Sequence, residues 1–285
     1  MPNQPRDRVL GLSAKARRLV LPLMALTIVV IVVGTLATRG SAAGDGPRVG
    51  GDLHAVSELN DQVFVGGHNG AGHRMSSGGW TQIVTLDDKD VMGWAQTGES
   101  LLAGGHGGLY RSLDNGSTFA VVDDLPVSDV HALGAFGERV YIASPELGVV
   151  MSDDAGATFA PVSNAGRDIM GTIWVDPTDS DVAIAPSMQA GVVKTTDGGA
   201  TWTGLDSPPG SMAVAVDASG RRMVVIGMEG AESSDDGGDT WKPLDVPKGT
   251  TAATYTSDGE LVVAVLSGER AQLYTSVNGQ WDLLI

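Results

Sequence analysis

Short apolar runs separated by Gly, Asn and Asp recur along the chain from residue 51 to residue 285. Between residues 91 and 123, for example, the runs VMGWAQT, SLLAGGH, GLYRSL and TFAVVD follow one another. Apolar runs of this length, bounded by turn-forming residues, are typical of β-strands. Six units of four such runs fill residues 51–285, so the pattern predicts an all-β domain made of six four-stranded sheets.

A different pattern precedes these units. Residues 19–38 form an uncharged stretch, LVLPLMALTIVVIVVGTLAT, and residues 1–18 hold five Lys or Arg against one Asp. At about 1.5 Å per residue, a helix of this length spans the hydrocarbon core of a bilayer. The flanking basic residues favour a cytoplasmic N-terminus. We therefore predict a cytoplasmic tail over 1–18, a transmembrane signal anchor over 19–38 and a linker over 39–50, with residues 51–285 outside the cytoplasm.

A cleaved signal peptide is the alternative interpretation of this N-terminal segment. The small residues of GSAAG at 40–44 resemble a cleavage site. The apolar region of a signal peptide is typically about 7–15 residues long, which is shorter than the stretch 19–38. An uncleaved anchor is therefore favoured, and both interpretations place residues 51–285 outside the cytoplasm.

Four segments share the motif S/T-x-D-x-G-x-T-F/W at a nearly constant spacing. Their aspartates are separated by 40, 43 and 39 residues, and degenerate copies at 76–80 and 275–281 extend the series. The motif resembles the Asp-box, or BNR, repeat of sialidases and many other β-propellers. The resemblance implies a six-bladed β-propeller over 51–285, with seven blades only if a unit at the ends is miscounted, and a structural role for the motif aspartates. These aspartates are Asp114, Asp154, Asp197 and Asp236.

A second motif, Asp-x-His or Asp-x-Met, stands at the start of the first run in four units. Residues i and i+2 of a strand point to the same face, and the innermost strand of a propeller blade begins at the upper face. The second run ends at this same face, where it adds His68, His106 and Glu146. Since His73 follows His68 in the same loop, all five histidines are expected on the upper rim. The four pairs are Asp52/His54, Asp90/Met92, Asp129/His131 and Asp168/Met170.

These side chains suit the binding of a metal ion. The chain has no Cys, and imidazole and thioether donors without thiolates favour copper, whereas carboxylates suit harder divalent ions. A carboxylate beside an imidazole also fixes its tautomer. The alternative is that the histidines cap strands and the methionines fill gaps in the core. The candidate metal ligands are His54, His68, His106, His131, Met92 and Met170, and the candidate ligand-binding carboxylates are Asp52, Asp90, Asp129 and Asp168.

Glycoside hydrolysis is the activity that the resemblance to sialidases implies. Such hydrolysis usually needs two carboxylates, and the candidate acids and bases are Asp90, Asp129 and Glu146. Trp94 would offer a stacking platform for a sugar ring. Sialidases clamp their substrate with three arginines, the first from an Arg-Ile-Pro motif, and this chain has no Arg-Ile-Pro. Residues 50–160 are more closely similar to bacterial exported Asp-box proteins that are often labelled glycosyl hydrolases.

The net charge of the chain limits the classes of partner that it is expected to bind. The chain carries a formal net charge of −16, and the residues after the basic tail are more acidic still, which argues against nucleic acid as a partner. The leading hypothesis is a bacterial, membrane-anchored, non-catalytic module that binds a ligand or metal ion, or assists assembly, with an envelope protein or a glycan as partner. Photosystem assembly factors with the same repeat illustrate such a role. The alternative is an exo-acting, sialidase-like glycoside hydrolase.

Overall fold

The computed structural model describes residues 46–75, 77–277 and 279–284. The predicted tail, the predicted anchor and residues 39–45 of the predicted linker lie outside the described residues. Within the part that is described, no helix has the length and apolar character needed to cross a bilayer.

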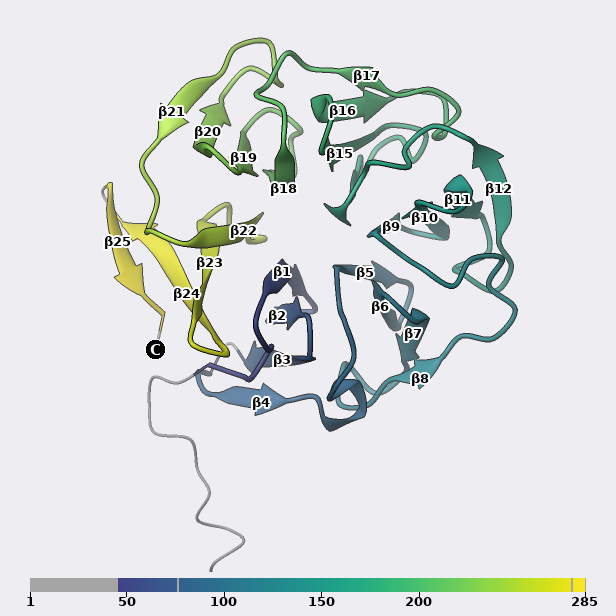
Figure 1. Ribbon diagram of the computed structural model, residues 1–285, viewed down its shortest axis with the longest axis horizontal. Helices are drawn as coiled ribbons and strands as arrows, with labels where there is room; N and C mark the ends of the chain where they lie inside the picture. The colour runs from purple at the N-terminus through teal and green to yellow at the C-terminus, as the bar shows by residue number, and fades with distance from the viewer. Residues whose placement is uncertain (1–45, 76, 278, 285) are drawn as a thin grey trace, which may run out of the picture. The chain divides into compact units, whose positions relative to one another are not determined.

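Residues 51–284 form a six-bladed β-propeller, as the repeat period predicts (Figure 1). Each blade is an antiparallel sheet whose first strand lies nearest the centre of the ring and whose fourth lies at the outside. The first three blades contain the following elements. Blade 1 has β1 (Leu53–Leu59), β2 (Gln62–Gly67), β3 (Gly70–Met75) and β4 (Trp80–Gln82), followed by the 3-10 helix η1 (Val84–Leu86). Blade 2 has β5 (Gly93–Thr97), β6 (Ser100–Gly105), β7 (Gly108–Ser112) and β8 (Ala120–Val121), and blade 3 has β9 (Ala132–Phe136), β10 (Arg139–Ser144), β11 (Gly148–Ser152) and β12 (Ala160–Ser163).

The remaining blades follow the same order, and a short strand links the third blade to the fourth. This strand, β13 (Gly171–Thr172), pairs in parallel with β9. Blade 4 has β14 (Trp174–Val175), β15 (Ala183–Ser187), β16 (Gly191–Thr195) and β17 (Thr203–Gly204). Blade 5 has β18 (Ser211–Val216), β19 (Met223–Gly227), β20 (Gly230–Ser234) and β21 (Lys242–Leu244), and blade 6 has β22 (Thr250–Tyr255), β23 (Leu261–Ser267), β24 (Arg270–Val277) and β25 (Gln280–Leu283).

The apolar core is divided into clusters that lie between neighbouring blades. Between blades 1 and 2, for example, the Phe64 and Trp94 rings are 5.2 Å apart and the Trp94 and Phe119 rings are 5.8 Å apart, measured between centroids. Trp94 is only 1% exposed, and tilted aromatic pairs at this separation add to the burial energy. Each blade is therefore held mainly by its two neighbours.

The turns at the four S/T-x-D-x-G-x-T-F/W motifs share one hydrogen-bond pattern. In blade 3, the Asp154 carboxylate accepts bonds from Ser152 Oγ at 2.7 Å and from Thr158 N and Oγ1 at 2.7 and 2.6 Å. These donors, those of Thr158 first, lower the pKa of Asp154 to about 2. The turns at Asp114, Asp197 and Asp236 repeat the same bonds. Each turn therefore provides its own polar partners on the outside of the ring.

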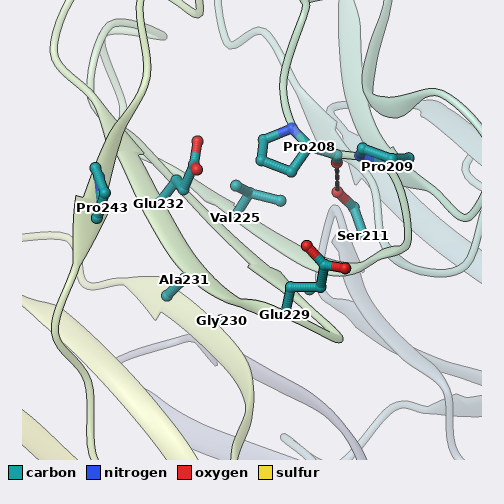
Figure 2. A pocket seen from close by; sticks show the side chains of 10 residues that line it. Pro208, Pro209, Ser211, Val225, Glu229, Gly230, Ala231, Glu232 and Pro243 are labelled. Atoms are coloured by element: carbon teal, nitrogen blue, oxygen red, sulfur yellow. Dashed lines mark hydrogen bonds between the residues drawn. The ribbon is translucent and has the colours of Figure 1, made fainter.

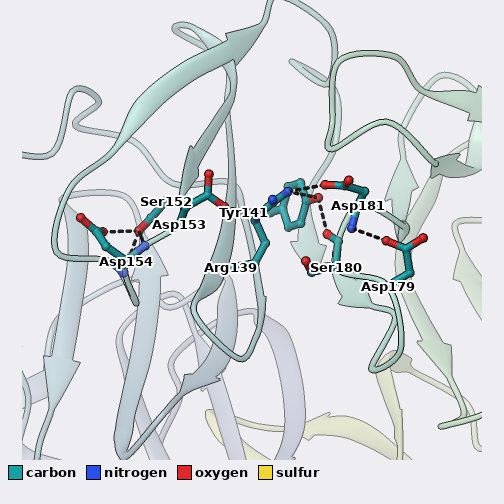
Figure 3. A network of polar contacts seen from close by, with 9 residues as sticks. Arg139, Tyr141, Ser152, Asp153, Asp154, Asp179, Ser180 and Asp181 are labelled. Carbon is teal, nitrogen blue, oxygen red and sulfur yellow. Dashed lines mark hydrogen bonds and ion pairs between the residues drawn. The ribbon is translucent and has the colours of Figure 1, made fainter.

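A polar network connects blade 3 to blade 4 (Figure 3). Arg139, on β10, donates to Asp153 of its own blade at 2.5 Å and to Asp181 of the next blade at 2.8 Å. The Tyr141 hydroxyl donates to the Ser180 carbonyl at 2.6 Å. Because these bonds cross between blades, they supplement the apolar packing at this junction.

Residues 46–50, which we call the clasp, close the ring between blades 6 and 1. The sequence assigns them to the linker, but the structure packs them against the start of β24, with Val49 fully buried. Ala271 N donates to the Pro47 carbonyl at 3.1 Å, and Val49 N donates to the Glu269 carbonyl at 2.9 Å. The reason is that β25 and the residue after it pair with β24 only from Leu273 onward, which leaves backbone groups at the outer edge of the beginning of β24 for the clasp to pair with.

Candidate metal centre on the upper face

Contacts between blades place the end of one blade's second strand beside the start of the next blade's first strand. Val91 N donates to the Gly67 carbonyl at 3.0 Å, and Val130 N donates to the Gly105 carbonyl at 3.1 Å. The residue after each of these glycines is a histidine. The backbone pairing therefore carries His68 to Asp90, and His106 to Asp129, on the face where the innermost strands begin.

The second glycine of each Gly-Gly-His sequence allows the first two strands of its blade to lie close together beside the histidine. A Cβ on Gly105 would lie 1.9 Å from the Asp90 carbonyl oxygen, and one on Gly67 would lie 2.1 Å from the Asp52 carbonyl oxygen. Asp90 and Asp52 belong to the same blades as Gly105 and Gly67, so side-chain atoms at such distances would push the end of a blade's second strand away from the start of its first strand. The glycines thus position the histidines that follow them, a signal that is visible in the sequence as VGGH and AGGH.

Three side chains from blades 2 and 3 form the most compact group of donors on this face. His106 Nε2 lies 3.3 Å from His131 Nε2, and Asp129 Oδ2 lies 3.2 Å from His131 Nε2. Asp129 Oδ1 lies 3.6 Å from His106 Nε2. A tetrahedral ion with metal–nitrogen bonds of about 2.0–2.1 Å separates its ligand atoms by about 3.3–3.4 Å. The separation of the two Nε2 atoms matches this value, and one donor atom from each of the three residues lies within 4.8 Å of the other two, so the group could hold one ion.

Asp90 joins this group to two further histidines. It is 7% exposed, its Oδ2 accepts a hydrogen bond from His106 Nδ1, and its Oδ1 lies 3.4 Å from His54 Nε2. His68 Nδ1 lies 3.8 Å from Asp90 Oδ2. When His106 Nδ1 donates to Asp90, its Nε2 presents a lone pair toward His131 and Asp129. The two triads, His54/His68/Asp90 and His106/Asp129/His131, thus meet at the contact between Asp90 and His106.

Three buried polar atoms of these triads have no hydrogen-bond partner among the described residues: His54 Nε2, Asp90 Oδ1 and Asp129 Oδ1. A buried acceptor without a partner is costly, and a cation bound at a triad would satisfy the unpartnered atoms of that triad. Burial lowers the pKa of His54, which keeps its imidazole neutral and able to coordinate at neutral pH. The donor set therefore fits a divalent transition-metal ion.

The other predicted carboxylates on this face lie outside both triads. Asp52 is exposed, and its Oδ1 accepts from Leu53 N at 3.0 Å. Asp168 accepts from Ser187 Oγ, and Glu146 is exposed and accepts from Ser128 Oγ at 2.7 Å. Trp94 packs in the core between Phe64 and Phe119 rather than at the surface. Asp52 is thus engaged by the backbone of the next residue, and Asp168 and Glu146 by serines of neighbouring loops.

The predicted methionines lie beside the triads. Met92 and Met170 line a central pocket of about 150 Å³ on this face, together with His54, Met188 and Met212. The innermost strands supply most of these residues from equivalent positions, and Met188 follows β15. The sequence pattern indicates Met212 but gives no reason to single out Met188.

The expectation that all five histidines lie on the upper rim is wrong for His73. This residue lies within β3, is 6% exposed and stacks on Phe64 with 5.2 Å between the ring centroids. Burial lowers its pKa. The turn of His68 and Asn69 is only two residues long, so the chain re-enters a strand at Gly70 and the period of two directs His73 inward. Four histidines therefore remain on the rim.

A second surface pocket lies on blade 5, apart from the triads. Its volume is about 220 Å³, and it is lined by Pro208, Pro209 and the acidic side chains of Glu229 and Glu232 (Figure 2). Ser211 Oγ donates to the Pro208 carbonyl at 3.1 Å at its edge. No histidine lines this pocket, so its lining lacks the nitrogen donors that the triads provide.

No protein-family model matches the chain, and no curated protein matches it. Solved structures match it at low identity. A GH74 xyloglucanase from Xanthomonas campestris aligns with a TM-score of 0.60 and 16% identity over 87% of this chain and 46% of the xyloglucanase. The WD40 β-propeller domain of Doa1 aligns with a TM-score of 0.57 and 12% identity over 86% of both chains. YCF48, solved bound to D1 peptide, aligns with a TM-score of 0.51 and 16% identity over 81% of this chain and 74% of YCF48. This chain spans less than half of the xyloglucanase, and these matches establish the propeller fold alone.

Proposed function

We propose that this propeller is a non-catalytic module that binds a divalent transition-metal ion at His106, His131 and Asp129. The observation that carries the proposal is the set of ligand separations, 3.2, 3.3 and 3.6 Å, in a group that leaves a buried carboxylate oxygen unsatisfied. Three protein donors leave a fourth coordination position for water or for a group on a partner.

The three residues of the other triad lie beside this proposed metal site. Asp90 accepts from His106 Nδ1 and thereby orients the imidazole, as a carboxylate commonly does at the other ring nitrogen of a metal-bound histidine. His54 Nε2 and His68 Nδ1 also lie 3.4 and 3.8 Å from the carboxylate oxygens of Asp90. Imidazole and carboxylate donors suit copper(II), zinc and nickel, with copper(II) bound most tightly.

The test is elemental analysis of the purified protein after incubation with copper(II), zinc or nickel and removal of free metal. We expect about one ion per chain in the wild type and a loss of at least about tenfold in affinity for His106→Ala and His131→Ala, because each change removes a ligand. Asp52→Asn is the matched control, since Asp52 is an exposed acid on the same face outside both triads. Wild-type protein that retains none of these ions would exclude the proposal.

The predicted anchor would determine on which side of the membrane the proposed metal site lies. In the proposed arrangement, residues 19–38 hold the propeller at the outer side of a bacterial membrane, where its upper face meets an envelope protein or a glycan. Membrane fractionation compares the full chain with a variant that lacks residues 1–38. Release of the shortened variant into the soluble fraction supports the anchor, and equal distribution of both proteins contradicts it.

Glycoside hydrolysis is the second candidate function. One observation favours it: Asp90 and Asp129 both contact His106, so the fold brings two carboxylates into one site. An acid and a base or nucleophile are what most glycosidases need. A panel of glycans assayed with wild type and Asp129→Asn tests this candidate. Turnover that Asp129→Asn abolishes supports it, whereas no turnover by the wild type eliminates it.

A further inference from the structure

The central pocket on the upper face is lined by thioethers to an unusual degree. Two of the ten methionines, Met1 and Met24, precede the described residues, and four of the other eight line this single pocket. These four are Met92, Met170, Met188 and Met212. The pocket has a volume of about 150 Å³, and its lining also includes His54 and Thr251.

The fold explains why these side chains converge. The start of each blade's innermost segment supplies one His, Met or Thr side chain. His54, Met212 and Thr251 are the second residues of β1, β18 and β22, and Met92, His131 and Met170 directly precede β5, β9 and β13. Repetition around a ring brings equivalent positions toward the same axis. Blades 2, 4 and 5 place a thioether there, and blade 4 adds Met188 from the end of β15.

The exposure of these methionines differs from that of a closed apolar core. Met92 is 4% exposed, but Met188 is 36% exposed, and Met170 and Met212 are half-buried. Methionine has three rotatable bonds, so its sulfur atoms can approach a common centre without movement of the backbone. A ring that needed only to be filled would be served by Leu, Ile or Val, which form the core between the blades.

We propose that the central pocket is a second metal site, selective for copper(I), with Met92, Met170 and Met212 as thioether ligands and His54 as the nitrogen ligand. Thioethers are soft donors that select monovalent copper over zinc or other divalent ions. This site differs in chemistry from the triad of His106, His131 and Asp129. It does not depend on the function proposed for that triad, because no residue is shared between the two donor sets.

The test is an anaerobic titration of the purified protein with copper(I) against a chromophoric copper(I) chelator. Leu replaces Met with little change of volume, so the double variant Met92→Leu/Met170→Leu retains the packing and loses two donors. Met228→Leu is the matched control, because Met228 is 70% exposed and lies outside this pocket. A thermal melt of each variant verifies that the fold is intact.

We expect wild type and Met228→Leu to take about one copper(I) from the chelator, and the double variant to bind it at least about tenfold more weakly. His106→Ala should retain copper(I) binding while losing the divalent ion, so failure of one site is distinguishable from failure of the other. The proposal is overturned if the wild type takes no copper(I), or if the folded double variant binds copper(I) as tightly as the wild type does.

Discussion

Asp90→Asn should change the stability of the metal-free protein and its metal affinity in opposite directions. Asp90 is 7% exposed, and its Oδ1 has no hydrogen-bond partner among the described residues. A buried polar atom without a partner costs about 1–3 kcal/mol. Asn is neutral, still accepts from His106 Nδ1, and adds an N–H that can donate to His54 Nε2 at the position where the two atoms are now 3.4 Å apart.

We therefore expect the metal-free variant to be more stable than the wild type by about 1 kcal/mol, which corresponds to about 2–4 °C in Tm for a domain of this size. The metal-bound state should be weakened, because a neutral amide orients and polarises the His106 imidazole less than a carboxylate does. Loss of such a partner lowers metal affinity by about 10–100-fold, or about 1.4–2.7 kcal/mol.

One assay measures both effects. Thermal melts are recorded with a chelator and with a fixed excess of the divalent ion, and the difference between the two melts reports the affinity, since binding to the folded state alone raises Tm. Asp52→Asn, on the same face, should leave both melts unchanged. If Asp90→Asn lowers Tm in the chelator and retains the full metal-induced rise, the carboxylate is a structural hydrogen-bond acceptor and the reasoning fails.

Three further predictions concern the fold. The pKa of Asp154 is about 2 in the folded protein and higher in the unfolded chain, so its contribution to stability is complete above about pH 4 and is lost as the pH falls toward 2; Asp154→Asn should flatten this part of the pH dependence in urea unfolding. Val49→Ala, in the clasp, should lower the free energy of unfolding by about 2 kcal/mol, and a smaller change in chemical denaturation than about 0.5 kcal/mol would contradict the observed burial. Gly105→Ala should lower the free energy of unfolding by about 1–3 kcal/mol and reduce metal uptake, because its Cβ would lie 1.9 Å from the Asp90 carbonyl oxygen. Gly51→Ala is the control, since a Cβ at Gly51 has open space around it. Equal stability and metal uptake of the two variants would contradict the steric argument.

The fold can be predicted from the sequence because the same pattern of strands and turns recurs in each unit. Four strands per unit and six units predict the ring, and the same repetition predicts that His54, Met92 and His131 share a face. Which residues on that face touch depends instead on backbone pairing between blades. His68 reaches Asp90 because β2 extends to Gly67 and pairs with the following blade, and no local pattern encodes that contact.

Each failure of prediction has a structural cause. His73 was expected in a loop, but a two-residue turn returns the chain to β3 and buries the ring against Phe64. Trp94 shares the strand of Met92, and its size allows it to fill the space between blades 1 and 2, so its 1% exposure follows from packing that a single strand does not reveal. The clasp has the composition of a linker, and its order results from the unpaired start of β24, more than 200 residues away in the sequence.

The clasp also implies that assembly of the His/Asp triads and closure of the ring are separate steps of folding. Every residue of the His/Asp triads lies before residue 132, in the three blades that a ribosome completes first. Arg48, in contrast, meets Arg270, so its pairing waits until nearly the whole polypeptide has emerged. The donors can therefore be brought together in an open arc of blades, while locking of the circle is a late step whose rate is limited by the search between distant ends of the polypeptide.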